Sequence, residues 1–457
     1  MRENRTFTGR FFTSALCAAA LALISCAGKQ RMAVSDAVAP DTIALYEVTQ
    51  DTITQDTAVQ EAVAAETVEP APKYVFLFIG DGMGFSHIAA AEAYLAASTG
   101  SIGNVSLSFT EFPTMGMATT YSANSYITCS SAAGTALSTG VKTDNNRLNV
   151  TPEGETLRSI AYDLQDAGYR IGIATSVSID HATPAAFFAS DTSRGSYYNI
   201  AAQLAPSGFD FFAGSGFLQP VKEVEGSEEN IYAQIQQAGY AVVRTPEELE
   251  QAPASSKMVM VQEEEHDNAA LVIAVNRKNT DGHGWTLADF TRTGIDRLTD
   301  SAGFFFMVEG GQIDWMAHNN DAVALIYEVI DFSKAIELAI EFYKKHPDET
   351  LIVVTADHET GGLALGYYTI PYELHPTPEV MHTQTGRTPL NTDEEKLIKA
   401  LPVVRELSGQ SGFSWTTAAH TGGAVPVFAI GAGSERFRGK MDNTDIPKRI
   451  RELMIRE

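Results

Sequence analysis

Cysteine is scarce in this chain, which has three cysteines among its 457 residues. Cys17 and Cys26 lie in the N-terminal segment, and Cys129 alone lies in the body of the chain. A disulfide within the body is therefore excluded, because a bridge needs two cysteines. The hydrophobic fraction of 44% is typical of a soluble globular protein, so we expect a packed core instead.

Positive charge is also in short supply. The chain has 32 Lys and Arg residues against 57 Asp and Glu residues, which gives a formal net charge of −25. A nucleic-acid-binding protein needs a basic footprint, so this balance argues against nucleic acid as a partner. The overall field also repels anionic substrates. Any phosphate-binding site must therefore contain its own positive charge, from metal ions or arginine.

No apolar run near the N-terminus is long enough to span a bilayer. Residues 11–24 (FFTSALCAAALALI) follow three arginines and form the short apolar region typical of an export signal. The run ends in LISC at 23–26, which resembles the lipobox of bacterial lipoproteins, whose cysteine is lipidated. We expect a signal peptide at 1–25, a lipid on Cys26 and a location on the periplasmic side of a bacterial membrane. An ordinary secretory signal, cut nearby, is the alternative.

The segment that follows has almost no aromatic residues and no glycine beyond Gly28. Residues 26–72 are rich in Ala, Val, Thr, Asp and Glu, which predicts an acidic flexible tether. We expect residues 73–457 to form one folded domain. Within it, residues 367–413 are rich in Pro, Thr and Glu and lack a clear strand pattern, so we interpret them as a cap or crown-like insertion over the site.

The body contains short, continuous apolar runs of the kind that form strands buried on both faces. These runs cover residues 74–79, 171–175, 304–308, 351–355 and 425–430. Helical patterns at 156–167 and 322–345 lie between them. The alternation predicts an α/β fold with three αβα layers around a doubly wound, mostly parallel sheet. Ligands bind such sheets beyond the carboxyl ends of the strands.

Acidic residues and histidines gather at those predicted strand ends. They are Asp81, Glu309, Asp314, His318, Asp357, His358 and, just before the last run, His420. Asp314 and His318 are four residues apart, which places them on one face of a helix. Zinc binds carboxylate oxygens and imidazole nitrogens of this kind. Any one of these residues alone is more often a surface residue than a ligand, but their shared position predicts a metal centre.

Six segments, taken together and in this order, resemble the alkaline phosphatase family from about residue 73 to the C-terminus. They are IGDGMG at 79–84, YITCSSAAGTALSTGVKT at 126–143, DHATPAAFFASDTSR at 180–194, VEGGQIDWMAH at 308–318, VTADHETGG at 354–362 and HTGG at 420–423. The resemblance implies hydrolysis of phosphate monoesters to an alcohol and inorganic phosphate at alkaline pH.

The resemblance also implies three metal sites. It assigns a first zinc ion to Asp314, His318 and His420, a second zinc ion to Asp81, Asp357 and His358, and a magnesium ion to Asp81, Thr183 and Glu309. An oxygen-only set suits magnesium, which keeps several of its waters.

The implied nucleophile is Ser130, at the start of a helix, which would form a phosphoserine intermediate. Arg194 matches the arginine that holds the phosphate oxygens, for which its planar fork is suited. Cys129 stands where the family pattern has aspartate, and Ser131 where it has alanine. Because that aspartate orients the arginine in some members, we expect Arg194 to be held more loosely here.

Two further positions depart from enteric members of the family. His181 stands where they carry aspartate, and Trp315 where they carry lysine. A neutral imidazole supplies no negative charge for a hard cation, so we expect weaker magnesium binding. Loss of the lysine ammonium predicts weaker binding of product phosphate, unless Trp315 only packs against the rim of the site.

Two other functions remain open at this point. One is a phosphodiesterase or another hydrolase of the same metal-dependent superfamily, although Arg194, Thr183 and Glu309 favour monoesters. The other is a non-catalytic lipoprotein that binds phosphate or metal. A homodimer is likewise an open alternative to a monomer.

The lipobox gives a direct test of export. Cys26→Ser should convert a protein that needs detergent for extraction into a soluble one, because the lipid has no attachment point. Fractionation of cells expressing each variant measures the change, and Cys17→Ser is the matched control that should stay with the membrane. Unchanged membrane partition of Cys26→Ser would refute lipidation at this residue.

Overall fold

A computed structural model of the chain describes residues 71–99, 101, 103–224, 227–253, 256–262, 270–274, 284–299, 302–365 and 413–455. The chain divides into two units, residues 1–67 and 68–457, and the described residues all belong to the second. The predicted signal peptide at 1–25 lies outside the described residues. Most of the predicted tether and of the predicted cap also lies outside the described residues. The described parts are the last two positions of the tether and Phe413 of the cap.

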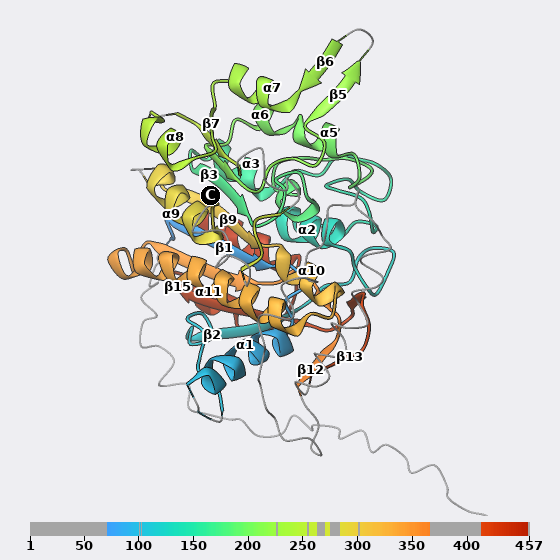
Figure 1. Cartoon of the computed structure of the whole chain (residues 1–457), viewed down its shortest axis with the longest axis vertical. Coiled ribbons are helices and arrows are strands. Elements are labelled where there is room, and N and C mark those ends of the chain that lie inside the picture. Colours follow the sequence, from blue (N-terminus) through green and yellow to red (C-terminus); the bar gives the residue numbers. More distant parts are fainter. Residues whose placement is uncertain are drawn as a thin grey trace, which may run out of the picture. The chain divides into compact units, whose positions relative to one another are not determined.

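A mixed sheet of ten strands forms the centre of the second unit (Figure 1). The strand order is β16-β2-β15-β10-β1-β9-β3-β4-β8-β7. Neighbouring strands are parallel, except that β15 runs antiparallel to both β10 and β2. The strands are β1 (Tyr74–Gly80), β2 (Thr114–Thr119), β3 (Arg170–Thr175), β4 (Phe211–Ala213), β7 (Ala241–Val243), β8 (Met258–Met260), β9 (Phe304–Gly310), β10 (Thr350–Thr355), β15 (Val425–Gly431) and β16 (Gly439–Asp442).

Three small two-stranded ladders complete the strands. They are β5 (Val221–Val224) with β6 (Ser227–Asn230), β11 (Glu359–Thr360) with β14 (His420–Thr421), and β12 (Leu363–Leu365) with β13 (Phe413–Trp415). The second and third ladders join the chain just after β10 to the chain just before β15. They therefore bring together two segments that are far apart in the sequence.

The apolar runs explain the middle of the sheet. All five runs predicted to be strands lie in it, as β1, β3, β9, β10 and β15. Every residue of β1, β9 and β10 is buried, as expected for parallel strands covered on both faces. The prediction of a mostly parallel α/β sheet is therefore confirmed.

The helices are mostly short, with one long exception. They are α1 (Phe85–Ser98), α2 (Ser130–Thr139), α3 (Ile160–Asp166), α4 (Ala182–Ala185), α5 (Tyr197–Ala201), α6 (Leu204–Ser207), α7 (Ile231–Gln237), α8 (Pro246–Gln251), α9 (Leu287–Leu298), α10 (Gln312–His318), α11 (Ala322–Lys345) and α14 (Asp445–Met454), with a 3-10 turn η2 (Ser434–Phe437).

The helix predicted at 322–345 is correct at both ends. At the N-terminal end, Asp321 caps α11 by accepting a hydrogen bond from the N–H of Ala324. The helix predicted from residue 156 was wrong at its start. Ser159 caps α3 instead, through a bond from the N–H of Ala161. Thr156 instead forms an isolated β-bridge with Val150, and Ser159 itself has extended backbone angles.

Two adjacent phenylalanines show that helices cover both faces of the sheet. Neighbouring residues of a strand point to opposite faces. The ring of Phe304 lies 5.6 Å from that of Phe342 on α11, whereas the ring of Phe305 lies 6.1 Å from that of Phe187, just after α4. Helices α1, α9 and α10 pack with α11, and α2, α3, α4 and α14 pack with one another. The three predicted layers are therefore present.

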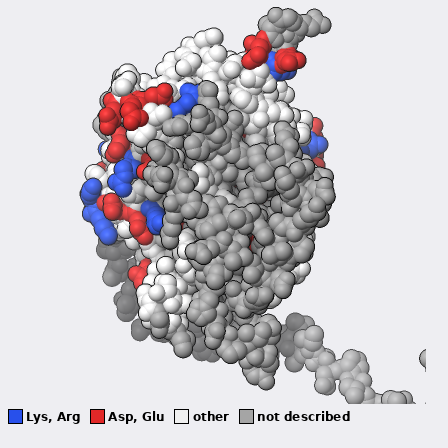
Figure 2. Space-filling view, viewed as in Figure 1, with Lys and Arg blue, Asp and Glu red and all other residues white. Residues whose placement is uncertain are grey.

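The described surface carries charges of both signs. Figure 2 shows acidic and basic side chains interspersed over α8, α9 and one end of α11, with no basic stripe among the described residues in this view. Within the described residues, no helix has the length and apolar composition that a membrane span requires.

Candidate active site

The carboxyl ends of the parallel strands β1 and β10 bring together three of the predicted ligands. Nε2 of His358 lies 3.4 Å from Oδ1 of Asp81 and 3.3 Å from Oδ2 of Asp357. All three side chains are fully buried. Gly82 follows Asp81 with a positive φ of 71° and donates its N–H to Oδ1 of Asp357 at 3.0 Å. The turn after β1 thus holds both carboxylates against one imidazole.

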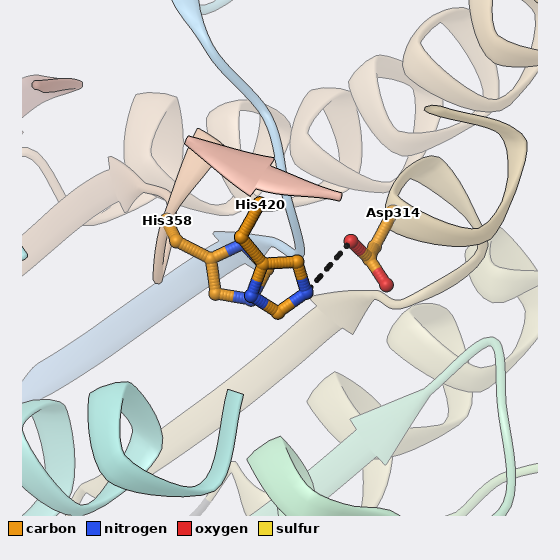
Figure 3. Close-up of side chains that lie close together, drawn as sticks. All are labelled: Asp314, His358 and His420. Carbon is orange, nitrogen blue, oxygen red and sulfur yellow. Dashed lines mark ion pairs between the residues drawn. The ribbon is translucent and has the colours of Figure 1, made fainter. Parts of the chain in front are cut away.

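The three ligands predicted for the first zinc ion form another group beside these residues. Helix α10 carries Asp314 and His318 on one face, and Nε2 of His318 lies 3.3 Å from Oδ2 of Asp314. His420, from β14, places its Nε2 at 3.1 Å from that of His318 and 3.7 Å from Oδ1 of Asp314. Figure 3 shows Asp314 facing the imidazoles of His358 and His420. Those two rings stack with centroids 3.6 Å apart, so the two groups adjoin.

Backbone carbonyls fix the orientation of the two outer histidines. Nδ1 of His318 lies 2.7 Å from the carbonyl oxygen of Ala418, and Nδ1 of His420 lies 2.8 Å from that of Thr128. A carbonyl can only accept, so each Nδ1 carries the hydrogen and each neutral ring has a lone pair on Nε2. Two lone pairs then face each other across 3.1 Å, which favours a cation bound by both.

A third group lies on the β9 side of the site. Asp81, His181 and Glu309 place ligand atoms within 4.8 Å of one another, and all three residues are buried. Thr183, which the sequence assigned to this site, donates its hydroxyl to Oδ2 of Asp357 at 3.4 Å. Within the described residues, both oxygens of Asp81 and Oε1 of Glu309 are buried without a hydrogen-bond partner. Orphaned oxygens of this kind suit a hard cation.

The four carboxyl groups of the site differ in the direction of their pKa shifts. Burial, followed by the charges of Asp357, Asp314 and Glu309, raises the pKa of Asp81 well above its usual range. Burial also raises the pKa of Asp357 to about 7 and that of Glu309 to about 8. For Asp314, burial raises the pKa, but the neighbouring histidines, His318 first, hold it well below its usual range. Without metal, the Asp81 side of the site therefore retains protons.

The predicted nucleophile adjoins the imidazole of His358. Ser130 is the first residue of α2, and its buried Oγ lies 3.2 Å from Nε2 of His358. Arg194 is half-buried, and its Nη2 lies 3.3 Å from Nε2 of His181. Burial is the main cause that lowers the pKa of His358 and of His420, and the positive charge of Arg194 adds a smaller effect in the same direction. The guanidinium therefore lies within electrostatic reach of both groups.

Cys129 occupies the N-cap position of the helix that begins at Ser130, but its side chain makes no capping hydrogen bond. Its sulfur lies 3.2 Å from the hydroxyl of Ser131 and accepts a bond from the N–H of Asn146 at 3.1 Å. Burial raises the pKa of this thiol, but these hydrogen bonds and the charge of Arg194 outweigh burial and lower the pKa overall. The sulfur therefore takes part in the local hydrogen bonding of its own loop.

Trp315 packs against the third group. It is buried, and its ring meets that of His181 edge-on at a centroid distance of 5.7 Å. The side chains of His181 and Trp315 are therefore in direct contact. A change at one of them alters the packing of the other.

Sequence reasoning missed the residues that orient the ligands. Thr360 lies inside the segment VTADHETGG, and its hydroxyl contacts both Asp314 and His358. Glu359, beside it, accepts a hydrogen bond from the hydroxyl of Thr421, next to His420. Hydroxyl and carboxylate side chains directly beside ligands were the available signal, but spacing alone does not say which way they point.

Comparison with known proteins gives the class of this site. The sequence profile of the family described as alkaline phosphatase matches residues 72–210 and 218–455. The chain is 33% identical to alkaline phosphatase 4 of Bacillus subtilis over 413 residues, covering 81% of this chain and 86% of the relative. It is 30% identical to streptomycin-6-phosphate phosphatase of Streptomyces griseus over 432 residues, covering 84% and 91%.

Solved structures agree with the sequence match. A cold-active alkaline phosphatase from the psychrophile Shewanella sp. superimposes with a TM-score of 0.72 at 28% identity, covering 84% of this chain and all of that chain. Alkaline phosphatase from the Antarctic bacterium TAB5 gives a TM-score of 0.65 at 29% identity, covering 84% and 98%. The chain belongs to the alkaline phosphatase family. It is a metal-dependent phosphoric monoester hydrolase. This was the function that the sequence favoured over a diesterase and over a non-catalytic binding protein.

Once its metal ions are removed, the folded protein should become less stable as the pH rises from 7 to 9. The unfolded chain releases these carboxyl protons near pH 4, whereas the folded apo-protein keeps them up to pKa values of about 7 for Asp357 and about 8 for Glu309. Stability from a raised pKa is lost as the pH passes through the folded value. Glu309 alone accounts for about 1 kcal/mol of unfolding free energy in this interval.

Thermal melts of chelator-treated protein at pH 7 and pH 9 measure this loss. The lowered pKa values of His358 and His420 act in the opposite direction only below about pH 6.5, outside the interval. Glu309→Gln is the matched control, because its side chain does not titrate and the loss should shrink. Equal pH dependence in the apo forms of Glu309→Gln and the parent would contradict the assignment.

Proposed function

We propose that the protein hydrolyses phosphate monoesters through a phosphoserine on Ser130, with two zinc ions and one magnesium ion in the three groups. The observation that carries this proposal is the 3.2 Å contact between Oγ of Ser130 and Nε2 of His358. His358 belongs to the second zinc set and stacks on His420 of the first, so the hydroxyl adjoins both sets.

The reaction takes two displacements at phosphorus. In the first, the hydroxyl of Ser130 releases its proton to solvent and Oγ forms a bond to phosphorus. The ester P–O bond breaks, and the alcohol leaves with a proton taken from solvent. In the second, water attacks the phosphoserine and releases inorganic phosphate and the free hydroxyl. When bound, the zinc ions would supply positive charge that favours the alkoxide of Ser130 and the negative leaving oxygen.

Two features of the chain support phosphate binding during these steps. The N–H groups of the first turn of α2 start at Ser130 and have no partners within the helix, so they attract an anion. The guanidinium of Arg194 contributes a permanent charge and a planar pair of donors. The hydrogen bond between Arg194 and His181 holds this side chain beside the third group.

The metal assignment follows the donor atoms. We assign one zinc ion to Asp314, His318 and His420, and the other to Asp81, Asp357 and His358. Magnesium is assigned to Asp81 and Glu309, with Thr183 on the same side and His181 adjoining. In two mutants of TAB5 alkaline phosphatase, a histidine is replaced by aspartate or glutamate and Mg is bound in the M3 site. This suggests that the histidine at the third group of our chain limits its magnesium affinity.

We further propose that the protein works on the periplasmic side of a bacterial membrane, held there by a lipid on Cys26. The proposal is supported by the lipobox-like end of the apolar run at 11–24. The Cys26→Ser fractionation is its test.

Ser130→Ala should abolish the covalent intermediate, because the attacking oxygen is gone. Incubation with a labelled aryl phosphate followed by an acid quench traps the phosphoenzyme. Ser131→Ala is the matched control, since it removes a hydroxyl one residue away whose contact is Cys129 rather than His358. Loss of label in Ser131→Ala together with retention in Ser130→Ala would move the nucleophile by one residue.

His181→Asp should tighten magnesium binding by about tenfold or more, because a carboxylate adds negative charge and an oxygen donor beside Asp81 and Glu309. Direct titration with magnesium, and the magnesium dependence of turnover, both measure the change. His181→Asn has the same size as the aspartate variant but no charge, so it should bind no more tightly than the parent. Equal affinities of the Asp and Asn variants would overturn the argument.

A further inference from the structure

Thr360 lies where the segments of the two zinc sets meet. It is fully buried on β11, and its N–H donates to the carbonyl of Gly82 at 3.1 Å, directly after Asp81. On its other side it pairs with His420 in the β11–β14 ladder. Its backbone is thus fixed to the neighbour of one zinc ligand and to another ligand itself.

The hydroxyl of Thr360 connects one ligand of each set. Its Oγ1 lies 2.6 Å from Oδ1 of Asp314 and 3.2 Å from Nδ1 of His358. An ionised carboxylate can only accept, so the hydroxyl proton points to Asp314. The hydroxyl oxygen then accepts from Nδ1–H of His358. A single atom therefore bridges the first set, through Asp314, and the second set, through His358.

This bridge decides the state of the shared imidazole. With the hydrogen held on Nδ1, the neutral ring of His358 has its lone pair on Nε2. That atom faces Oδ1 of Asp81, Oδ2 of Asp357 and the hydroxyl of Ser130. The lone pair is therefore directed to the second zinc set.

The surroundings leave the hydroxyl little freedom. A Cβ on Gly82 would lie 2.9 Å from both Oγ1 of Thr360 and Oδ1 of Asp314. Gly82 therefore closes tightly over the bridge. If the hydroxyl is removed without loss of volume, its two hydrogen bonds have no evident replacement.

We propose that Thr360 is a positioning residue that makes the two zinc sites fill together. A zinc ion held by Asp314 fixes the carboxylate that receives the hydroxyl proton, and the same hydroxyl then orients His358 for the second ion. By linkage, an ion at His358 favours the first site equally. The inference rests on the proposed zinc sets and adds a coupling between them.

The test compares stepwise zinc binding by Thr360→Val, Thr360→Ser and the parent. Each apo-protein is titrated with zinc against a chromophoric chelator, with excess magnesium to fill the third site. Thr360→Val keeps the volume but removes the hydroxyl, and should weaken both zinc steps by about tenfold or more. Thr360→Ser keeps the hydroxyl and should stay within about threefold of the parent.

Native mass spectrometry at one zinc equivalent measures the coupling itself. The parent and Thr360→Ser should show mainly zinc-free and two-zinc protein, whereas Thr360→Val should accumulate the one-zinc form. Thr355→Val is the matched control. It removes another buried threonine hydroxyl, bonded to the carbonyl of Pro426 on β15, and should behave as the parent.

Several outcomes would overturn the proposal. They are unchanged zinc constants in Thr360→Val, weakening of one step alone, or the same loss in Thr360→Ser or Thr355→Val. If circular dichroism shows that Thr360→Val does not fold, Thr360→Ala replaces it in the test. Thr360→Ala also removes the hydroxyl, places no second methyl group near Gly82, and should weaken both zinc steps in the same way. Failure of the parent to bind two zinc ions is a separate result, which rejects the proposed metal sets themselves.

Discussion

Buried negative charge at one edge of the sheet is the constraint on which the site depends. Asp81, Glu309, Asp314 and Asp357 converge there with almost no exposure. The charge of Arg194 lowers the pKa of Asp81 only slightly against the rise caused by burial and the other carboxylates. Burial of several carboxylates is costly unless cations or protons neutralise them. Bound metal ions resolve this conflict in the working enzyme. In their absence, raised pKa values resolve it by protonation.

The sheet makes such a concentration of charge possible. β1 lies between β9 and β10, in parallel register, so the residues after all three strands emerge at one edge. The continuous apolar burial of these strands supplies a rigid base for polar groups that would not otherwise stay together. The stability of the core and the cost of the site are therefore linked through the same three strands.

Hydrogen bonds around the ligands do the finer positioning. The carbonyls of Ala418 and Thr128 fix the rings of His318 and His420, and the hydroxyl of Thr360 does the same for His358. Each leaves Nε2 directed into the site. These partners come from loops and short ladders rather than from the main sheet, so the imidazoles depend on contacts between distant segments.

The sequence by itself determined the main strands, the ends at which ligands gather and the membership of the ligand sets as a hypothesis. It could do so because continuous apolar runs and ordered motifs are local patterns. The strands β4, β7 and β8, of three residues each, carry no pattern long enough to predict, and their place comes from pairing with neighbours. Only the tertiary structure brought His181 into contact with Arg194, and Thr360 between Asp314 and His358. Those contacts depend on how far-apart segments pack and on side-chain direction, neither of which sequence spacing specifies.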